Sequence, residues 1–134
     1  MISTYTEFSR TTGILAYHKN RAVGWCAVSP RREFPTLDRS RVARPIDDAE
    51  VWSIPCFYVD KAYRRQGLTT GLITAALNYA RDSGAKIVEA YPKDPPSRIA
   101  TDDAFVGLAW TFSACGFVEV ARRTPTRPVM RYVI

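Results

Sequence analysis

Cysteine, histidine and long apolar runs are scarce in this chain of 134 residues. The three cysteines, Cys26, Cys56 and Cys115, are odd in number and form no C-x-x-C pair. This pattern favours neither a disulfide framework nor a zinc site. No segment reaches the roughly 18 uninterrupted apolar residues that a membrane helix needs. The N-terminal stretch MISTYTEFSR also lacks the basic-then-apolar layout of a secretion signal. We therefore expect a cytoplasmic protein that has no membrane partner.

Acidic residues are fewer than basic ones, with 13 Asp and Glu against 19 Lys and Arg, and the formal net charge is +6. Such an excess favours an anionic partner, which could be a nucleic acid, an acidic surface or a phosphorylated small molecule. It is concentrated in residues 31–44, 61–66 and 122–131. Because no long basic helix or aromatic RNA-binding signature accompanies it, nucleic acid is the least favoured of these partners. An ordinary basic surface explains most of these residues.

The length and the 46% of hydrophobic residues suffice for one packed domain, and no boundary divides residues 1–134. The predicted strands are Ile14–His18, Ala22–Val28, 51–59, 85–92, 117–123 and 129–134, and the predicted helices are 68–83 and 104–115. We expect residues 30–50 to form a long surface excursion, and Pro55 to cause a bulge or a splay within its strand. The fold class is α/β: a mixed, mostly antiparallel central sheet with one βαβ unit and flanking helices.

The stretch YRRQGLTT lies between the end of the predicted strand at Val59 and the helix that starts near Leu68. The first N–H groups of a helix have no partner inside the helix, and the aligned peptide dipoles add positive potential there. Phosphate or pyrophosphate is the natural ligand of such a site. Gly67 allows the backbone to approach the anion closely, and Arg64 and Arg65 can add charge-assisted hydrogen bonds.

The P-loop and the dinucleotide-binding motif G-x-G-x-x-G are both absent. The sequence R-R-Q-G-L-T instead closely resembles the R/Q-x-x-G-x-G/A motif of the GNAT acyltransferases. The stretch AFVGLAWTFSACGF is similar to the second conserved helix of that family, which usually ends in LY-x-x-x-GF. Predicted elements from residue 13 to 134 follow the family's order. The resemblance implies a GNAT-like fold, acetyl-CoA as the acyl donor, and acetyl transfer to a primary amine by direct attack.

The same resemblance implies the residues that bind acetyl-CoA. These are Arg64, Arg65, Gln66, Gly67, Leu68, Thr69 and Thr70 around the pyrophosphate, Phe57, Tyr58 and Val59 beside the pantetheine, and Phe112 packed against the cofactor. Two residues depart from the family pattern. Phe112 stands where the family has a tyrosine that is thought to protonate the leaving thiolate, and Thr69 stands where Gly or Ala is preferred.

Only 12 residues precede the first predicted hairpin, where the family usually has a strand and one or two helices. A shortened chain would leave the acceptor side open or covered by a second subunit, and the second case implies a homodimer. The acceptor itself, a small-molecule amine or a peptide amine, cannot be chosen from the sequence. The departures also favour an alternative function, an acyl-CoA-binding module without catalytic activity.

Glu89 and Tyr91 are the candidate catalytic residues. Glu89 interrupts the apolar run Ile87–Ala90, where a carboxylate is costly unless it is used or paired. It could serve as the general base for the amine; alternatively, it pairs with an arginine or lies at a wet strand end. Tyr91 lies on the same face of the strand and could act as an acid or a substrate contact, or be a core residue. Cys56 is a weaker candidate, for a nucleophile, because a free cysteine is usually a small buried hydrophobe.

Overall fold

The computed structural model describes residues 4–7, 13–64, 67–96 and 106–134. The β-strands are β1 (Thr4–Glu7), β2 (Gly13–His18), β3 (Arg21–Ala27), β4 (Ser29–Pro30), β5 (Trp52–Ile54), β6 (Phe57–Val59), β7 (Ile87–Ala90), β8 (Val118–Thr124) and β9 (Arg127–Val133). The α-helices are α1 (Leu68–Asp82) and α2 (Ala109–Ala114). Three short 3-10 helices are η1 (Arg31–Glu33), η2 (Pro35–Arg39) and η3 (Lys61–Tyr63).

The strands form two sheets, and the chain passes from one sheet to the other twice, between β3 and β4 and between β5 and β6. The first sheet has the order β1-β2-β3-β6 and the second has the order β4-β5-β7-β9-β8. Residues Pro55 and Cys56 separate β5 from β6. A proline has no N–H to donate to a ladder, and here the chain leaves the second sheet and continues in the first. The predicted splay at Pro55 is therefore confirmed, as is the mixed α/β fold class.

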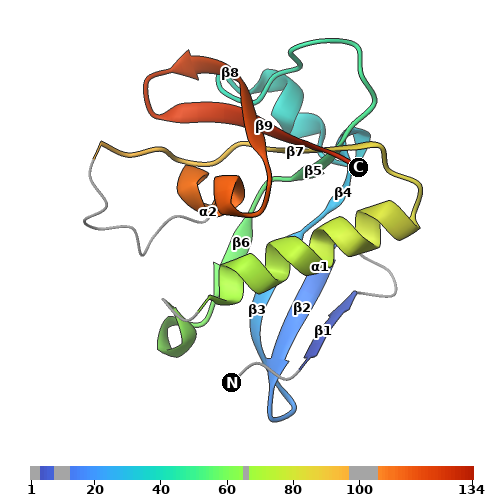
Figure 1. Ribbon diagram of the computed structural model, residues 1–134, viewed down its shortest axis with the longest axis vertical. Helices are drawn as coiled ribbons and strands as arrows, with labels where there is room; N and C mark the ends of the chain where they lie inside the picture. The colour runs from blue at the N-terminus through green and yellow to red at the C-terminus, as the bar shows by residue number, and fades with distance from the viewer. Residues whose placement is uncertain (1–3, 8–12, 65–66, 97–105) are drawn as a thin grey trace.

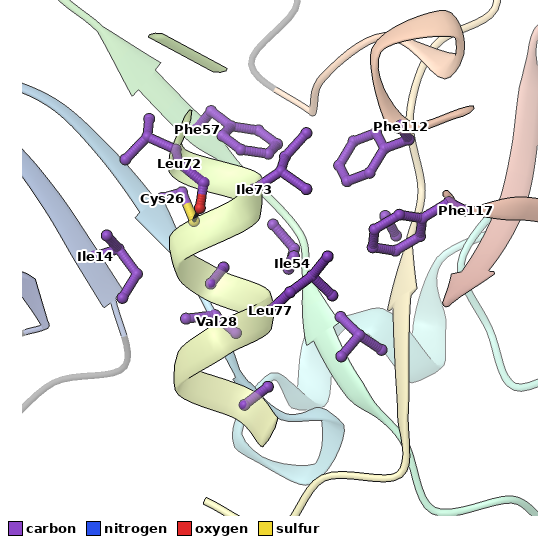
Figure 2. Close-up of a cluster of buried hydrophobic side chains, with 14 of the residues drawn as sticks. Ile14, Cys26, Val28, Ile54, Phe57, Leu72, Ile73, Leu77, Phe112 and Phe117 are labelled. Carbon is purple, nitrogen blue, oxygen red and sulfur yellow. Dashed lines mark hydrogen bonds between the residues drawn. The ribbon is translucent and has the colours of Figure 1, made fainter. Parts of the chain in front are cut away.

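The central βαβ unit is β5, α1 and β7. Strand β5 pairs in parallel with β7, with Trp52 opposite Val88 and Ile54 opposite Ala90. Helix α1 crosses one face of the molecule in front of β2 and β3 (Figure 1). Its buried residues are Leu68, Leu72, Ile73, Ala76, Leu77 and Ala80, which recur at helical spacing. Figure 2 shows Leu72, Ile73 and Leu77 of the helix together with Ile14, Cys26, Val28 and Ile54 in this core.

Residues 31–50 cover the opposite face of the second sheet. Side chains alternate between the faces of a strand. Val88 and Ala90 of β7 belong to the core under α1, whereas Tyr91 packs on the other face with Val129 and Ala43. The partly buried Leu37, Val42 and Ile46 add to this second, smaller cluster. The predicted excursion is thus a covering layer that includes η1 and η2.

The beginning of α2 differs from the prediction. The apolar spacing predicts a helix over 104–115, but α2 begins at Ala109; residues 104 and 105 lie outside the described residues. Gly107 has a φ of +85°, which ends a right-handed helix. The neighbouring backbone pairs instead with Lys93, whose N–H donates to the carbonyl of Gly107 and whose carbonyl accepts from Ala109. Strand β1 also escaped prediction.

No helix in the described ranges is long and apolar enough to cross a membrane.

Candidate cofactor and acyl-transfer site

Strand β6 ends the first sheet with one edge unpaired by any described strand. On its paired side, the N–H of Asp60 donates to Val23 and the carbonyl of Cys56 accepts from Ala27. Hydrogen-bonded and non-bonded pairs alternate along an antiparallel ladder. The polar backbone groups of Tyr58 therefore face β3, and those of Phe57 and Val59 face the open edge. Of the three residues predicted to contact pantetheine, Phe57 and Val59 offer their backbone groups on that side.

The start of α1 lies a few residues beyond this edge. Gly67 is its N-cap residue, with a φ of +78° and no side chain to cap the helix. The first intrahelical hydrogen bond runs from Gly71 N–H to Gly67 O over 3.2 Å. The N–H groups of Leu68, Thr69 and Thr70 thus precede the helical ladder. No acidic residue occupies this first turn, and a Cβ placed on Gly67 would have nothing within 4 Å.

Arg64 binds the strand edge in this structure. Its Nε donates to the carbonyl oxygen of Val59 at 3.2 Å. This hydrogen bond connects the end of β6 to the residue that follows η3. It also occupies one of the carbonyl groups at the open edge. The other two residues of the predicted loop, Arg65 and Gln66, lie outside the described residues.

Gly24 sets the position of α1 against the first sheet. A Cβ on Gly24 would lie 2.9 Å from Cδ2 of Leu68, the first residue of α1, and 3.4 Å from the carbonyl oxygen of Tyr58. The absence of a side chain therefore allows the start of the helix to lie directly on β3. Gly24 was not among the residues predicted from the sequence. Its signal is a glycine within a strand, which often marks a close approach.

Phe57, Gly107 and Phe112 are packed in a tight group between β6 and α2. The rings of Phe57 and Phe112 are 5.8 Å apart between centroids. Phe112 has no exposed surface, and its ring also lies 4.9 Å from that of Phe117. Figure 2 shows these aromatic rings beside Ile73 of α1. The predicted contact of Phe112 with the cofactor would require this packing to open.

Glu89 lies at the centre of a buried ionic cluster. Its side chain is 2% exposed, and both carboxylate oxygens accept hydrogen bonds. Oε1 accepts from Tyr91 Oη at 2.8 Å and from Arg31 Nη1 at 3.3 Å. Oε2 accepts from Arg131 Nε at 2.7 Å. Two guanidinium groups from distant parts of the chain therefore neutralise this carboxylate.

Tyr91 belongs to the same cluster. Its hydroxyl accepts from Arg31 at 2.8 Å, forms a 2.7 Å hydrogen bond with Ser53 and donates to Glu89. Burial, and then the neighbouring charge of Glu89, raise the pKa of this phenol well above its ordinary value. The structure brings the two predicted catalytic residues together, but both are inside the protein and have their hydrogen-bond partners. This arrangement favours the pairing alternative for Glu89, and the catalytic roles of both residues remain predictions.

The outer arginine contacts connect the cluster to residues 31–50. Arg131 binds both carboxylate oxygens of Asp47 at 2.8 Å, and Arg31 binds Asp38 at 3.1 Å. The hydrogen bond from Arg131, followed by one from the backbone of Ala49, lowers the pKa of Asp47 to about 2. Asp47 thus serves in an ion pair.

A pocket of about 440 Å³ lies between α2, β8 and residues 94–96. Trp110 and Met130 contribute to its wall. Its charged groups bind one another, since Arg122 donates to Asp94 at 2.7 Å and to Glu119 at 2.8 Å.

The thiol of Cys56, the predicted weaker candidate for a nucleophile, is half-buried. Burial raises its pKa, and a raised pKa does not suit a nucleophile.

The splayed strand edge and the uncapped, glycine-preceded helix start are the features expected of the acyltransferase class that the motif resembles. The model of the acetyltransferase (GNAT) family matches residues 2–101, and the chain belongs to this family. A search of curated protein sequences gives no significant match.

Solved structures agree on the fold. The ribosomal-protein-S18-alanine N-acetyltransferase from Escherichia coli is 14% identical, with a TM-score of 0.60 over 96% of this chain and 72% of that one. The polyamine N-acetyltransferase of Drosophila melanogaster is 14% identical, with a TM-score of 0.62 over 92% and 75%. The PaiA N-acetyltransferase of Thermoplasma acidophilum, solved with coenzyme A, is 11% identical, with a TM-score of 0.59 over 91% and 60%.

Proposed function

We propose that this protein is an acetyl-CoA-dependent N-acetyltransferase that acts on the primary amine of a small molecule or a peptide. The observation that carries the proposal is the start of α1. There, three N–H groups precede the helical ladder, and the space above Gly67 is open. The free edge of β6 lies next to it along the chain. A diphosphate at the helix and an extended chain along the strand fit this arrangement.

Each part of the site has a separate task in this proposal. The N–H groups of Leu68, Thr69 and Thr70 bind the diphosphate. The backbone groups of Phe57 and the N–H of Val59 hold the pantetheine beside β6, since the carbonyl of Val59 is bonded to Arg64. The amine nitrogen then attacks the thioester carbonyl carbon, so that a C–N bond forms and the C–S bond breaks. Coenzyme A leaves as the thiolate and takes up a proton. Glu89 as base and Tyr91 as acid remain the sequence-based candidates, each of which would have to give up present hydrogen bonds.

The second candidate function is acyl-CoA binding without catalysis. The paired state of Glu89 and the buried Phe112 at the usual tyrosine position support it. Release of free thiol from acetyl-CoA separates the two functions. An assay with polyamines, agmatine and a peptide with an N-terminal alanine tests amine classes named for structural neighbours. Amine-dependent thiol release supports the enzyme, and binding without release with any amine supports the module.

Two glycines at the ends of α1 provide a matched test of the cofactor site. Gly67 and Gly84 both have positive φ, +78° and +94°, and a Cβ on either would meet nothing within 4 Å. Replacement of either by leucine introduces similar backbone strain, about 1–2 kcal/mol. In Gly67→Leu, however, the new side chain occupies the space proposed for the diphosphate.

Calorimetric titration with acetyl-CoA measures the difference. Gly67→Leu is expected to weaken binding by about tenfold or more, equivalent to about 1.4 kcal/mol or more, whereas Gly84→Leu keeps the wild-type affinity. Adenosine and pantetheine, which lack the diphosphate, serve as control ligands. Equal affinity of the two variants for acetyl-CoA would contradict the assignment of the diphosphate to this helix.

A further inference from the structure

The tip of the β2–β3 hairpin reaches the segment just before α1. Lys19 and Asn20 form the turn, with φ values of +51° and +66°, as in the type I′ turns that close two-residue hairpins. His18 and Arg21 flank this turn and lie opposite each other in the ladder. The tight turn thus fixes the backbone positions of His18 and Arg21.

Both side chains bind η3, one at each end. Arg21 Nη2 donates to Asp60 Oδ2 at 2.8 Å, and the other oxygen of Asp60 caps η3 by accepting from Ala62 N–H at 3.1 Å. His18 Nδ1 lies 2.8 Å from the hydroxyl of Tyr63, the last residue of η3. The rings of His18 and Tyr63 also form an edge-to-face contact at 5.4 Å between centroids. The hairpin tip therefore holds the whole length of η3.

The position of η3 matters because it leads into the helix start. Tyr63 is followed by Arg64, which is bonded to Val59 O, and α1 begins four residues later, at Leu68. On the far side, Leu68 is buried and lies so close to Gly24 that no Cβ would fit between them. The described residues on the two sides, Tyr63 and Leu68, are thus both in contact with the hairpin: Leu68 with β3 and Tyr63 with the hairpin tip.

We infer that His18 and Arg21 are positioning residues for the diphosphate end of acetyl-CoA, acting through Tyr63 and Asp60. The inference rests on the proposed function. A helix start and an η3 that are already held in place lose less conformational freedom when an anion binds, and preorganisation of this kind appears as affinity. Neither residue contacts the acyl group, so the hairpin tip controls binding of the donor and leaves the chemical step unchanged.

Two substitutions remove the contacts with little other change. Tyr63→Phe keeps the ring and deletes the hydroxyl that binds His18. We expect acetyl-CoA to bind about fivefold more weakly, the result when the usual contribution of one hydrogen bond to stability appears in full as affinity. Arg21→Ala removes an exposed ion pair, and we expect a loss of about twofold. If the two contacts act independently, the double variant loses about tenfold. Arg21→Lys keeps the charge opposite Asp60 and is expected to restore most of the affinity.

The measurements are acetyl-CoA titration by calorimetry and steady-state kinetics with an amine found in the thiol-release assay. The expected pattern is a raised KM for acetyl-CoA, an unchanged kcat and an unchanged affinity for pantetheine. Arg81→Ala is the matched control, because it removes an exposed hydrogen bond to Asn78 near the other end of α1. Its affinity for acetyl-CoA is expected to equal that of the wild type.

The outcomes separate this inference from the function on which it rests. Wild-type protein that binds no acetyl-CoA overturns both. Wild-type binding that is retained within about twofold in the double variant overturns the positioning role alone, even where the variant melts at a lower temperature. A fall in kcat without a rise in KM also overturns it, because the contacts would then affect the chemical step.

Discussion

The start of α1 and the Glu89 cluster differ in how far their polar groups are hydrogen-bonded within the protein. At the start of α1, three N–H groups precede the helical ladder and the adjoining edge of β6 is unpaired by described strands. In the cluster, both oxygens of Glu89 and the hydroxyl of Tyr91 have partners. The first region offers backbone groups in open space, and the second uses charged side chains inside the protein.

Under the proposed function, this contrast separates the residues that bind the ligand from those that support the fold. Unused hydrogen-bonding capacity at a surface is what a ligand can employ, whereas a fully paired carboxylate holds parts of the protein together. Through Glu89, Arg131 connects β9 to β7 and Arg31 connects residues 31–50 to β7. Arg131 also binds Asp47, and Arg31 binds Asp38, both within residues 31–50. An unusual polar residue in a buried strand can therefore indicate support as well as catalysis.

Loss of the Glu89 charge is expected to have the largest effect. In Glu89→Gln, Arg31 and Arg131, which are 12% and 11% exposed, would face each other without the carboxylate between them. Removal of one partner from a buried ion pair typically costs about 3–5 kcal/mol. We expect a loss of this size in the free energy of unfolding, measured by urea denaturation, with Asp48→Asn as an exposed control.

A different result would reverse the comparison. If Glu89→Gln keeps its stability but loses acetyl transfer with a changed pH–rate profile, Glu89 is a base that acts in the reaction. The cluster would then belong to the active site and not to the support of the fold.

Substitution of Gly107 tests the tight packing beside β6. In Gly107→Ala, the new Cβ would lie 2.7 Å from Cε2 of Phe112 and 3.0 Å from Cε2 of Phe57, at a φ of +85°. Backbone strain and overpacking together are expected to destabilise the protein by about 2–4 kcal/mol. Gly84→Ala has similar backbone strain but open space, and we expect about 1 kcal/mol. Thermal unfolding of the two variants measures the difference, and equal losses would show that the aromatic rings adjust freely.

Substitution of Asp47, at the exposed end of the cluster, is expected to have the smallest effect on stability, and this effect depends on pH. The pKa of Asp47 is lowered from 3.8 to about 2 in the folded protein. Its contribution to stability is therefore present above pH 3.8, the unfolded value, and is lost as the pH falls through 2. Because Asp47 is 48% exposed, solvent screens the pair and the contribution is modest.

Melting temperatures of the wild type and Asp47→Asn measure this contribution. We expect a small difference at about pH 5 that closes toward pH 2. A difference that stays constant over this range would show that the carboxylate charge is not what Asp47 contributes.

Local patterns in the sequence predicted most of the fold. Apolar spacing indicated α1, Pro55 indicated the splay, and the order of strand, turn and helix indicated the uncapped helix start at Gly67; the anion site there remains a prediction. The start of α2 was mispredicted because Gly107 adopts a left-handed conformation within an apolar pattern that suits a helix. A cytoplasmic location and a homodimer remain predictions.

Contacts between distant residues could not be predicted. The two arginines of Glu89 lie 58 residues before it and 42 residues after it, and no local spacing reports such a distance. The bond between His18 and Tyr63 spans 45 residues. Glu89 is therefore recognisable from the sequence as an unusual residue, whereas the identity of its partners is not.

The Arg31–Glu89–Arg131 arrangement also constrains how this protein can evolve. Loss of Glu89 leaves two buried guanidinium groups without their shared carboxylate, and loss of either arginine leaves one oxygen of Glu89 with fewer partners, whereas joint replacement by apolar residues of similar volume is often tolerated. Single substitutions are therefore expected to be rare among close relatives, and the three positions are expected to change together. Residues 31, 89 and 131 would then be inherited as one unit, although the chain carries them far apart.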